Sequence, residues 1–213
     1  MNAAPGAPSF GTTALNQGRS APAAPQAELL FTRRFSMGHR LIAGTSDRCA
    51  IPHGHNEHVT VSLAAGLGHP SWDGAGGSGR LDGHANMLLP FAEAKGRWHR
   101  FIDERMDHSF QIGRDDPLLD WFRTHEPSRL GRLVVTPGDP TTELLAALLM
   151  AKMNAFLHAQ GDVLRLTALE IRETPTNAVR LVGGDPSAYL PVCPAVEGEG
   201  PLPWWHRADD STA

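Results

Sequence analysis

The sequence has few cysteines, no excess of basic residues and no long apolar run. Only two of its 213 residues are cysteines, Cys49 and Cys193, which argues against a disulfide framework. The formal net charge of −4 does not favour general nucleic-acid binding. No apolar run approaches the roughly 20 residues of a membrane span, and the N-terminus lacks the basic and apolar regions of a signal peptide. We therefore expect a soluble, cytoplasmic protein in a reducing compartment, without a nucleic-acid or membrane partner.

Composition divides the chain into a central domain and two extensions. Residues 1–27 are rich in Ala, Pro, Gly and Ser and show no hydrophobic periodicity, which predicts a disordered N-terminal extension. Residues 28–183 carry the periodic patterns of a folded domain of ordinary size. Residues 184–213 are interpreted as a C-terminal tail, which contains Trp204-Trp205-His206 close to its end.

The central domain reads as two strands, two helices and two strands. Alternating apolar residues predict strands at 28–42, 55–63, 163–173 and 178–182, and a glycine-rich loop at 66–83. Pro90 opens a helical apolar stripe that reaches Met106, and Asp139-Pro140 is interpreted as the cap and first turn of the second helix. This order predicts an α+β fold with helices on one face of an antiparallel sheet.

The run Cys49-Ala-Ile-Pro-His53-Gly-His55 has the residues of a metal site. On a strand, His53 and His55 point to the same side, and Gly54 keeps the space between them clear. Imidazole is a preferred zinc ligand, and Cys49 is near enough to be a fourth ligand or a reactive thiol beside the metal. The alternative is a surface histidine pair beside a buried cysteine.

Other residues extend this constellation. His39, on the preceding strand, would complete a three-histidine site with one open position, which is typical of catalytic zinc. Asp107 and His108 are adjacent, so they interact only if a turn or strand replaces helical geometry there. Arg48 precedes Cys49 and is a candidate phosphate contact, the alternative being a solvated surface charge.

The chain resembles the 6-pyruvoyltetrahydropterin synthase and 6-carboxytetrahydropterin synthase family over most of its folded part. Six motifs carry the resemblance, in order: Phe35-x3-His39-x-Leu41, Cys49-x3-His53-Gly-His55, Phe91 with Lys95, Asp107-His108, Pro140-Thr-Thr-Glu143 and Glu173-Thr174. The three-residue gap between Cys49 and His53 is more similar to the carboxy-forming branch, because the pyruvoyl branch has a longer gap.

The resemblance implies a T-fold, a four-stranded antiparallel sheet with two helices on one face, assembled as trimers or hexamers. It also implies a role for each site residue. The metal ligands would be His39, His53 and His55 for Zn2+; the catalytic residues would be Cys49 as base with Asp107 and His108 as relay; the pterin contacts would be Glu173, Thr141, Thr142 and Glu143.

The implied activity is a zinc-dependent lyase of the queuosine pathway. It would convert 7,8-dihydroneopterin triphosphate to 6-carboxy-5,6,7,8-tetrahydropterin and release acetaldehyde and triphosphate. The alternatives are pyruvoyl-type triphosphate elimination and a non-catalytic zinc-containing pterin-binding module. The chain departs from the family pattern at Pro90, where an Asp is usual, at Glu57, where an aromatic is common, and at Leu144, where an Asn often stands.

Overall fold

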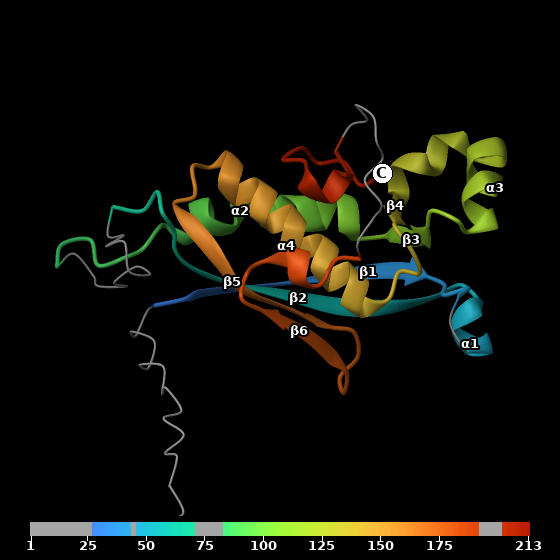
Figure 1. Cartoon of the computed structure of the whole chain (residues 1–213), viewed down its shortest axis with the longest axis horizontal. Coiled ribbons are helices and arrows are strands. Elements are labelled where there is room, and N and C mark those ends of the chain that lie inside the picture. The colour runs from blue at the N-terminus through green and yellow to red at the C-terminus, as the bar shows by residue number, and fades with distance from the viewer. Residues whose placement is uncertain (1–26, 44–45, 71–82, 192–201) are drawn as a thin grey trace, which may run out of the picture.

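The computed structural model describes residues 27–43, 46–70, 83–191 and 202–213. Its centre is a twisted sheet with two long helices on one face (Figure 1). The four predicted strands are present with shifted ends: β1 (Leu29–His39), β2 (His53–Ala65), β5 (Leu164–Arg172) and β6 (Ala178–Val182). They lie side by side in this order, and each neighbouring pair is antiparallel.

The helices cover the sheet face on which the apolar residues of the strands alternate. Phe31, Phe35 and Met37 of β1 are buried there, whereas the residues between them are exposed or half-buried. The covering helices are α2 (Phe91–Phe101) and α4 (Thr142–Ala159). Twelve of the 18 residues of α4 are buried, so this helix is the centre of the core.

The four predicted antiparallel strands form only part of the sheet, which among the described residues has six strands and is mixed. β3 (Ser109–Gly113) pairs parallel with β1, and β4 (Leu133–Thr136) pairs parallel with β3. The connection between them contains α3 (Pro117–His125) and a 3₁₀ turn (Pro127–Arg132). Both strands are short and buried with little alternation, and such strands lack the period-two pattern that reveals exposed ones.

The ends of the two main helices also differ from the prediction. The first helix ends at Phe101 and continues as a π-helical turn (Ile102–Met106). The second is capped by Thr141, whose hydroxyl accepts a hydrogen bond from the Leu144 N–H at 3.3 Å. Asp139 is not the cap, because its carboxylate accepts instead from the backbone N–H groups of Ile42 and Ala43, at 3.1 and 2.8 Å.

Part of the segment interpreted as a tail belongs to the packed structure. Residues 202–213 lie against α4, and Trp204 is buried in the core. The predictions for residues 1–26, for most of the glycine-rich loop (71–82) and for residues 192–201 lie outside the described residues. Within the described ranges, no helix combines the length and apolar character that a membrane crossing requires.

Candidate metal and pterin site

The three predicted histidine ligands converge at one end of the sheet. His39 ends β1, and His53 and His55 begin β2, where the register pairs His39 with His53. One ring nitrogen from each histidine lies within 4.8 Å of the other two. The Nε2 atoms of His39 and His53 are 3.1 Å apart. Nitrogens bound to one tetrahedral zinc ion at 2.0–2.1 Å would be roughly 3.3 Å apart, so the spacing fits a shared metal ion.

The hydrogen bonds of two rings fix which nitrogen is free for a metal. Nδ1 of His39 lies 2.9 Å from the Pro140 carbonyl oxygen, and Nδ1 of His53 lies 2.9 Å from that of Ile51. A carbonyl oxygen only accepts, so each Nδ1 donates its proton and each Nε2 presents a lone pair. Two lone pairs then face each other, which is unfavourable unless a cation lies between them. Burial lowers the pKa of His39 and favours the neutral ring that binds metals.

Gly54 allows this arrangement for a different reason from the one predicted. A Cβ atom at this position would lie 2.5 Å from the backbone oxygen of Met37 on β1. The glycine is therefore needed for the close approach of the two backbones, not to clear space between the histidine rings.

Glu173 joins this histidine group from the end of β5. Its Oε1 atom accepts a hydrogen bond from the Thr142 hydroxyl at 2.7 Å and lies 3.9 Å from Nε2 of His55. Thr142 is the first residue of α4, after the capping Thr141. The structure thus brings a carboxylate, a hydroxyl and the candidate metal ligands together. Glu143, the next residue of α4, is exposed.

The Asp107-His108 pair has the turn geometry that its chemistry requires. Asp107 is extended after the π-helical turn, and His108 has a left-handed φ of 58°. This turn lets Nδ1 of His108 donate to the Asp107 carboxylate at 2.8 Å. The Ser36 N–H donates to the same carboxylate at 2.7 Å, and this bond is the main cause that lowers the pKa of Asp107. The pair is thus fixed to β1, while the His108 side chain is mostly exposed.

Cys49 and Arg48 lie on a single helical turn, α1 (Asp47–Ala50). Cys49 is a half-buried free thiol, and among the described residues it is not a member of the group of converging ligand atoms. Arg48 is exposed. The roles of both residues stay predictions. Arg40, the residue after His39, forms a bidentate ion pair with buried Asp116.

Two buried polar residues near the site were not predicted. Glu57, two residues after His55, and Gln111, opposite His39 in the β1–β3 register, are both fully buried. Within the described part of the chain, none of their side-chain oxygen and nitrogen atoms has a hydrogen-bond partner. The only sequence signal was Glu57 itself, an acid where the family pattern has an aromatic. Burial, and next the charge of Glu173, raise the pKa of Glu57 to about 8.

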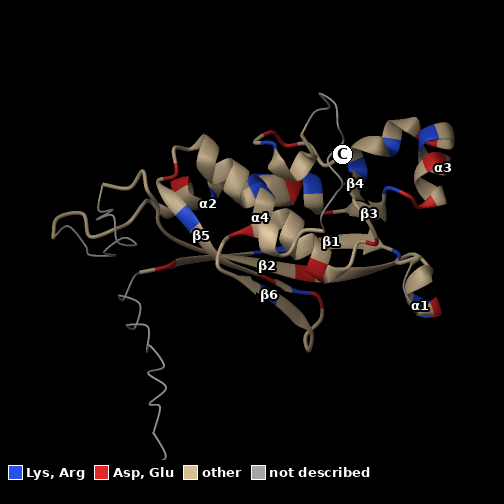
Figure 2. Cartoon of the chain, in the orientation of Figure 1, with Lys and Arg blue, Asp and Glu red and all other residues tan. Residues whose placement is uncertain are grey.

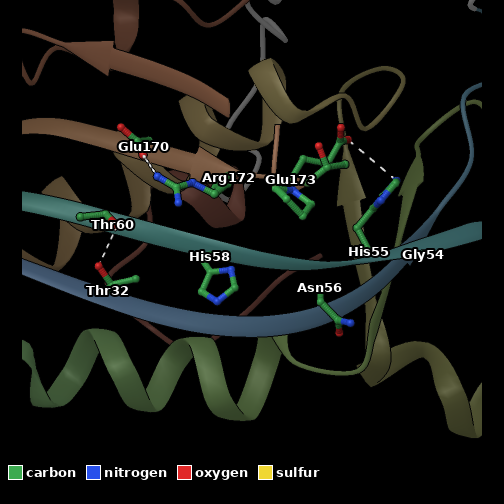
Figure 3. A pocket seen from close by; sticks show the side chains of 11 residues that line it. Thr32, Gly54, His55, Asn56, His58, Thr60, Glu170, Arg172 and Glu173 are labelled. Carbon is green, nitrogen blue, oxygen red and sulfur yellow. Dashed lines mark hydrogen bonds and ion pairs between the residues drawn. The ribbon is translucent and has the colours of Figure 1, made fainter. Parts of the chain in front are cut away.

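The site opens into a hollow of about 710 Å³ on the sheet (Figure 3). His55 and Glu173 line it together with residues of β1, β2 and β5. His55 and His58 leave the β2 ribbon on opposite sides, as their odd spacing requires (Figure 3). The hollow is large enough for a ligand of the size of a cofactor.

The comparison with known families shows to which family the chain belongs. The model of the family described as 6-pyruvoyl tetrahydropterin synthase matches residues 28–183. The chain belongs to this family. The match confirms the resemblance inferred from the motifs, and with it the expectation of an enzyme of the lyase type.

Individual relatives are distant. The chain is 27% identical over 142 residues to a probable 6-carboxy-5,6,7,8-tetrahydropterin synthase of Halobacterium salinarum, a match that covers 67% of this chain and 77% of that protein. An uncharacterized protein of Wolinella succinogenes has a similar fold, with a TM-score of 0.56 and 23% identity over 73% of this chain and 97% of the other. The 6-pyruvoyl tetrahydropterin synthase of Caenorhabditis elegans is 20% identical, with a TM-score of 0.46 over 76% of this chain and 99% of the other.

Proposed function

We propose that the chain is a zinc-dependent lyase that converts 7,8-dihydroneopterin triphosphate to 6-carboxy-5,6,7,8-tetrahydropterin, acetaldehyde and triphosphate. The observation that carries the proposal is the 3.9 Å approach of Glu173 to His55. It joins a carboxylate suited to the pterin ring to the three imidazoles that would hold the metal. The short Cys49–His53 gap supports the carboxy-forming reaction over the pyruvoyl reaction.

Glu173 would hold the pterin by its guanidine-like edge. A carboxylate accepts two parallel N–H bonds from such an edge, as it does from arginine. The Thr142 hydroxyl already donates to Oε1 and so fixes the orientation of the carboxylate. The capping Thr141 holds the start of α4 in place and thereby positions Thr142.

The ligand set fits Zn2+, which would be held by His39, His53 and His55 with an open position for substrate oxygens. The metal would supply Lewis acidity that makes the substrate side chain easier to deprotonate. Cys49 would be the base, since a thiolate near a cation is usable near neutral pH. His108, oriented by Asp107 at 2.8 Å, would move the second proton.

We further propose that the chain assembles as a trimer or hexamer. Among the described residues, β6 pairs only with β5, and β1 pairs with β3 only at Met37–His39. Two open sheet edges are therefore left, with the exposed apolar residues Leu30 and Val182 on them. Such edges require pairing or covering, and pairing between subunits would close them.

Product analysis tests the proposal. The purified chain is incubated with 7,8-dihydroneopterin triphosphate and zinc, and the pterin product and acetaldehyde are measured by mass spectrometry. We expect 6-carboxy-5,6,7,8-tetrahydropterin and acetaldehyde in equal amounts. A pyruvoyl pterin without acetaldehyde would assign the chain to the other branch, and tight pterin binding with no product would make it a binding module.

A further inference from the structure

The segment between β4 and the first residue of α4 contacts several parts of the candidate site. The Pro140 carbonyl oxygen accepts from Nδ1 of His39 at 2.9 Å, and the Thr142 hydroxyl donates to Glu173 at 2.7 Å. Asp139, which precedes both, contacts a third part of the chain. Its two carboxylate oxygens accept from backbone N–H groups of the segment that leaves β1, at 3.1 and 2.8 Å. The Asp139 carboxylate thus connects the start of α4 to the chain that follows a candidate metal ligand.

The segment that Asp139 holds leads to Cys49. It begins directly after His39, and the Leu41 N–H donates to the Cys49 carbonyl oxygen at 2.8 Å. The two residues after Leu41 are those whose N–H groups donate to Asp139. Cys49 is therefore bonded to a residue whose neighbours are bonded to Asp139, so the position of the Cys49 backbone depends on that of the carboxylate.

Packing does little to hold the helical turn that carries Cys49. None of the four residues of α1 is buried, and two of them are charged, one of each sign (Figure 2). The turn lies beyond the ends of β1 and β2, outside the layer of helices that covers the sheet (Figure 1). A single polar turn is far shorter than a helix that is stable in isolation. Its position therefore depends on hydrogen bonds to the rest of the fold.

The Asp139 side chain supplies two acceptors to this segment. One carboxylate oxygen accepts from Ile42 and the other from Ala43, so a single side chain binds two consecutive N–H groups. Hydrogen bonds to an ionised carboxylate are roughly twice as strong as neutral ones. An asparagine here would keep one acceptor oxygen and place an amide donor against the second N–H group. An alanine would keep neither bond.

We propose that Asp139 is a positioning residue that holds the Cys49 thiol beside the candidate metal ligands. This rests on the proposed function, in which Cys49 is the base. A base must lie within hydrogen-bond reach of the proton that it abstracts. A displacement of about 1 Å at a catalytic group can lower a rate roughly 10²-fold. Asp139 would thus act on the rate through Cys49, without contact to the substrate.

The first test is the steady-state kinetics of the zinc-loaded, full-length chain with 7,8-dihydroneopterin triphosphate. We expect Asp139→Ala to lower kcat roughly 10–10²-fold and to change KM less than about twofold, because Glu173 and Thr142 keep their contact. Asp139→Asn, which keeps one acceptor, should lower kcat by a smaller factor. Both variants should keep the metal content of the parent, because the bond from His39 is to the backbone of Pro140.

The second test follows the thiol without turnover. The rate at which iodoacetamide alkylates Cys49 is measured with and without zinc, by peptide mass spectrometry that separates Cys49 from Cys193. In the parent, zinc should raise this rate about fivefold or more, since a nearby cation favours the thiolate. In Asp139→Ala, the ratio of the two rates should fall below about twofold.

Asp185→Ala is the matched control. Asp139 and Asp185 both stand in a Gly-Asp-Pro tripeptide, and Asp185 also accepts from a backbone N–H group, that of Ser187 at 2.9 Å. This bond caps a 3₁₀ turn (Pro186–Ala188) after β6, outside the candidate site. The control should keep the kcat, the KM and the zinc effect of the parent.

Several outcomes would overturn the proposal. These are a parental kcat in Asp139→Ala, a raised KM without a lower kcat, a loss of metal in proportion to activity, or effects of the same size in Asp185→Ala. An alkylation rate of Cys49 that zinc does not change in the parent would also overturn it. If Asp139→Ala does not fold, the same criteria apply to Asp139→Asn. If the parent forms no product but its zinc effect depends on Asp139, the lyase proposal fails and the positioning of Cys49 stands.

Discussion

Two fully buried ionisable residues, Lys152 on α4 and Glu57 on β2, differ in their hydrogen bonding. The Lys152 ammonium donates to the backbone oxygens of Trp204, Arg207 and Ser211, at 2.9, 3.0 and 3.3 Å. Glu57 has no hydrogen-bond partner for either carboxyl oxygen within the described residues. Burial is the main cause of both pKa shifts, lowering that of Lys152 to about 8 and raising that of Glu57 to about 8.

The difference separates a structural region from a site. Around Lys152 the C-terminal residues close over α4, and the rings of Phe101, Phe156 and Trp204 lie within 5.7 Å of the ammonium. The Lys152 ammonium has three backbone acceptors for its three protons, which is the usual condition of a buried polar group. Glu57 and Gln111, next to the histidine group, do not meet this condition. Their unpartnered polar atoms lower the stability of the fold there. We interpret the first region as optimised for folding and the second for binding.

The largest expected effect is on the site. His53→Ala should lower the metal content, whereas Cys49→Ala should keep the metal and lower turnover by roughly 10²–10⁴-fold, the usual contribution of a general base. Metal analysis and product formation measure the two effects. His158→Ala, which changes an exposed histidine at the end of α4, should alter neither. Loss of metal in the Cys49 variant would instead make Cys49 a ligand.

The next largest effect is on the structural region. Lys152→Met removes the donor of three carbonyl groups and should lower the free energy of unfolding at pH 7 by about 2–4 kcal/mol. Urea denaturation measures it. The control is Lys95→Met, the only other lysine, which is half-exposed on α2. If both substitutions lowered the free energy of unfolding equally, the hydrogen bonds of the buried Lys152 would contribute no more to stability than the contacts of the half-exposed Lys95.

The pH dependence sharpens the same comparison. The pKa of Lys152 is lowered from 10.5 to about 8 in the folded state. Below pH 8 the ammonium carries its full burial cost, and this cost disappears as the pH rises from 8 to 10.5, where the unfolded chain also loses the proton. Over that window the wild type should gain about 1–3 kcal/mol relative to Lys152→Met. Urea titrations of both proteins at pH 8, 9 and 10 would show a constant difference if the pKa were unshifted.

The smallest effect is expected at Glu57. Glu57→Met replaces a buried, unpartnered carboxyl by an apolar side chain of similar length and should raise the free energy of unfolding by about 1–2 kcal/mol. Urea denaturation at pH 7 measures the gain, and Glu57→Gln, which keeps a polar group, should give less of it. A loss of stability in Glu57→Met would mean that the carboxyl has a bonding partner in solution, and the contrast with Lys152 would then fail.

Much of the fold could be predicted where the pattern is local. The alternation along β1 and β2 and the apolar stripe of α2 are written into consecutive residues, so those elements were found with small errors at their ends. β3 and β4 were missed because short strands buried on both faces show no alternation. Asp139 was misread as a cap because its bonds to Ile42 and Ala43 join positions almost 100 residues apart.

The sequence by itself determined the side-by-side pair His53 and His55, because a strand repeats every two residues, and it determined the family through six ordered motifs. Only the tertiary structure decided what those residues meet. Strand register placed His39 against His53, and the start of α4 carried Thr142 to Glu173. Periodicity acts over a few residues, whereas register and packing join distant segments, so the contacts that make the site required the fold.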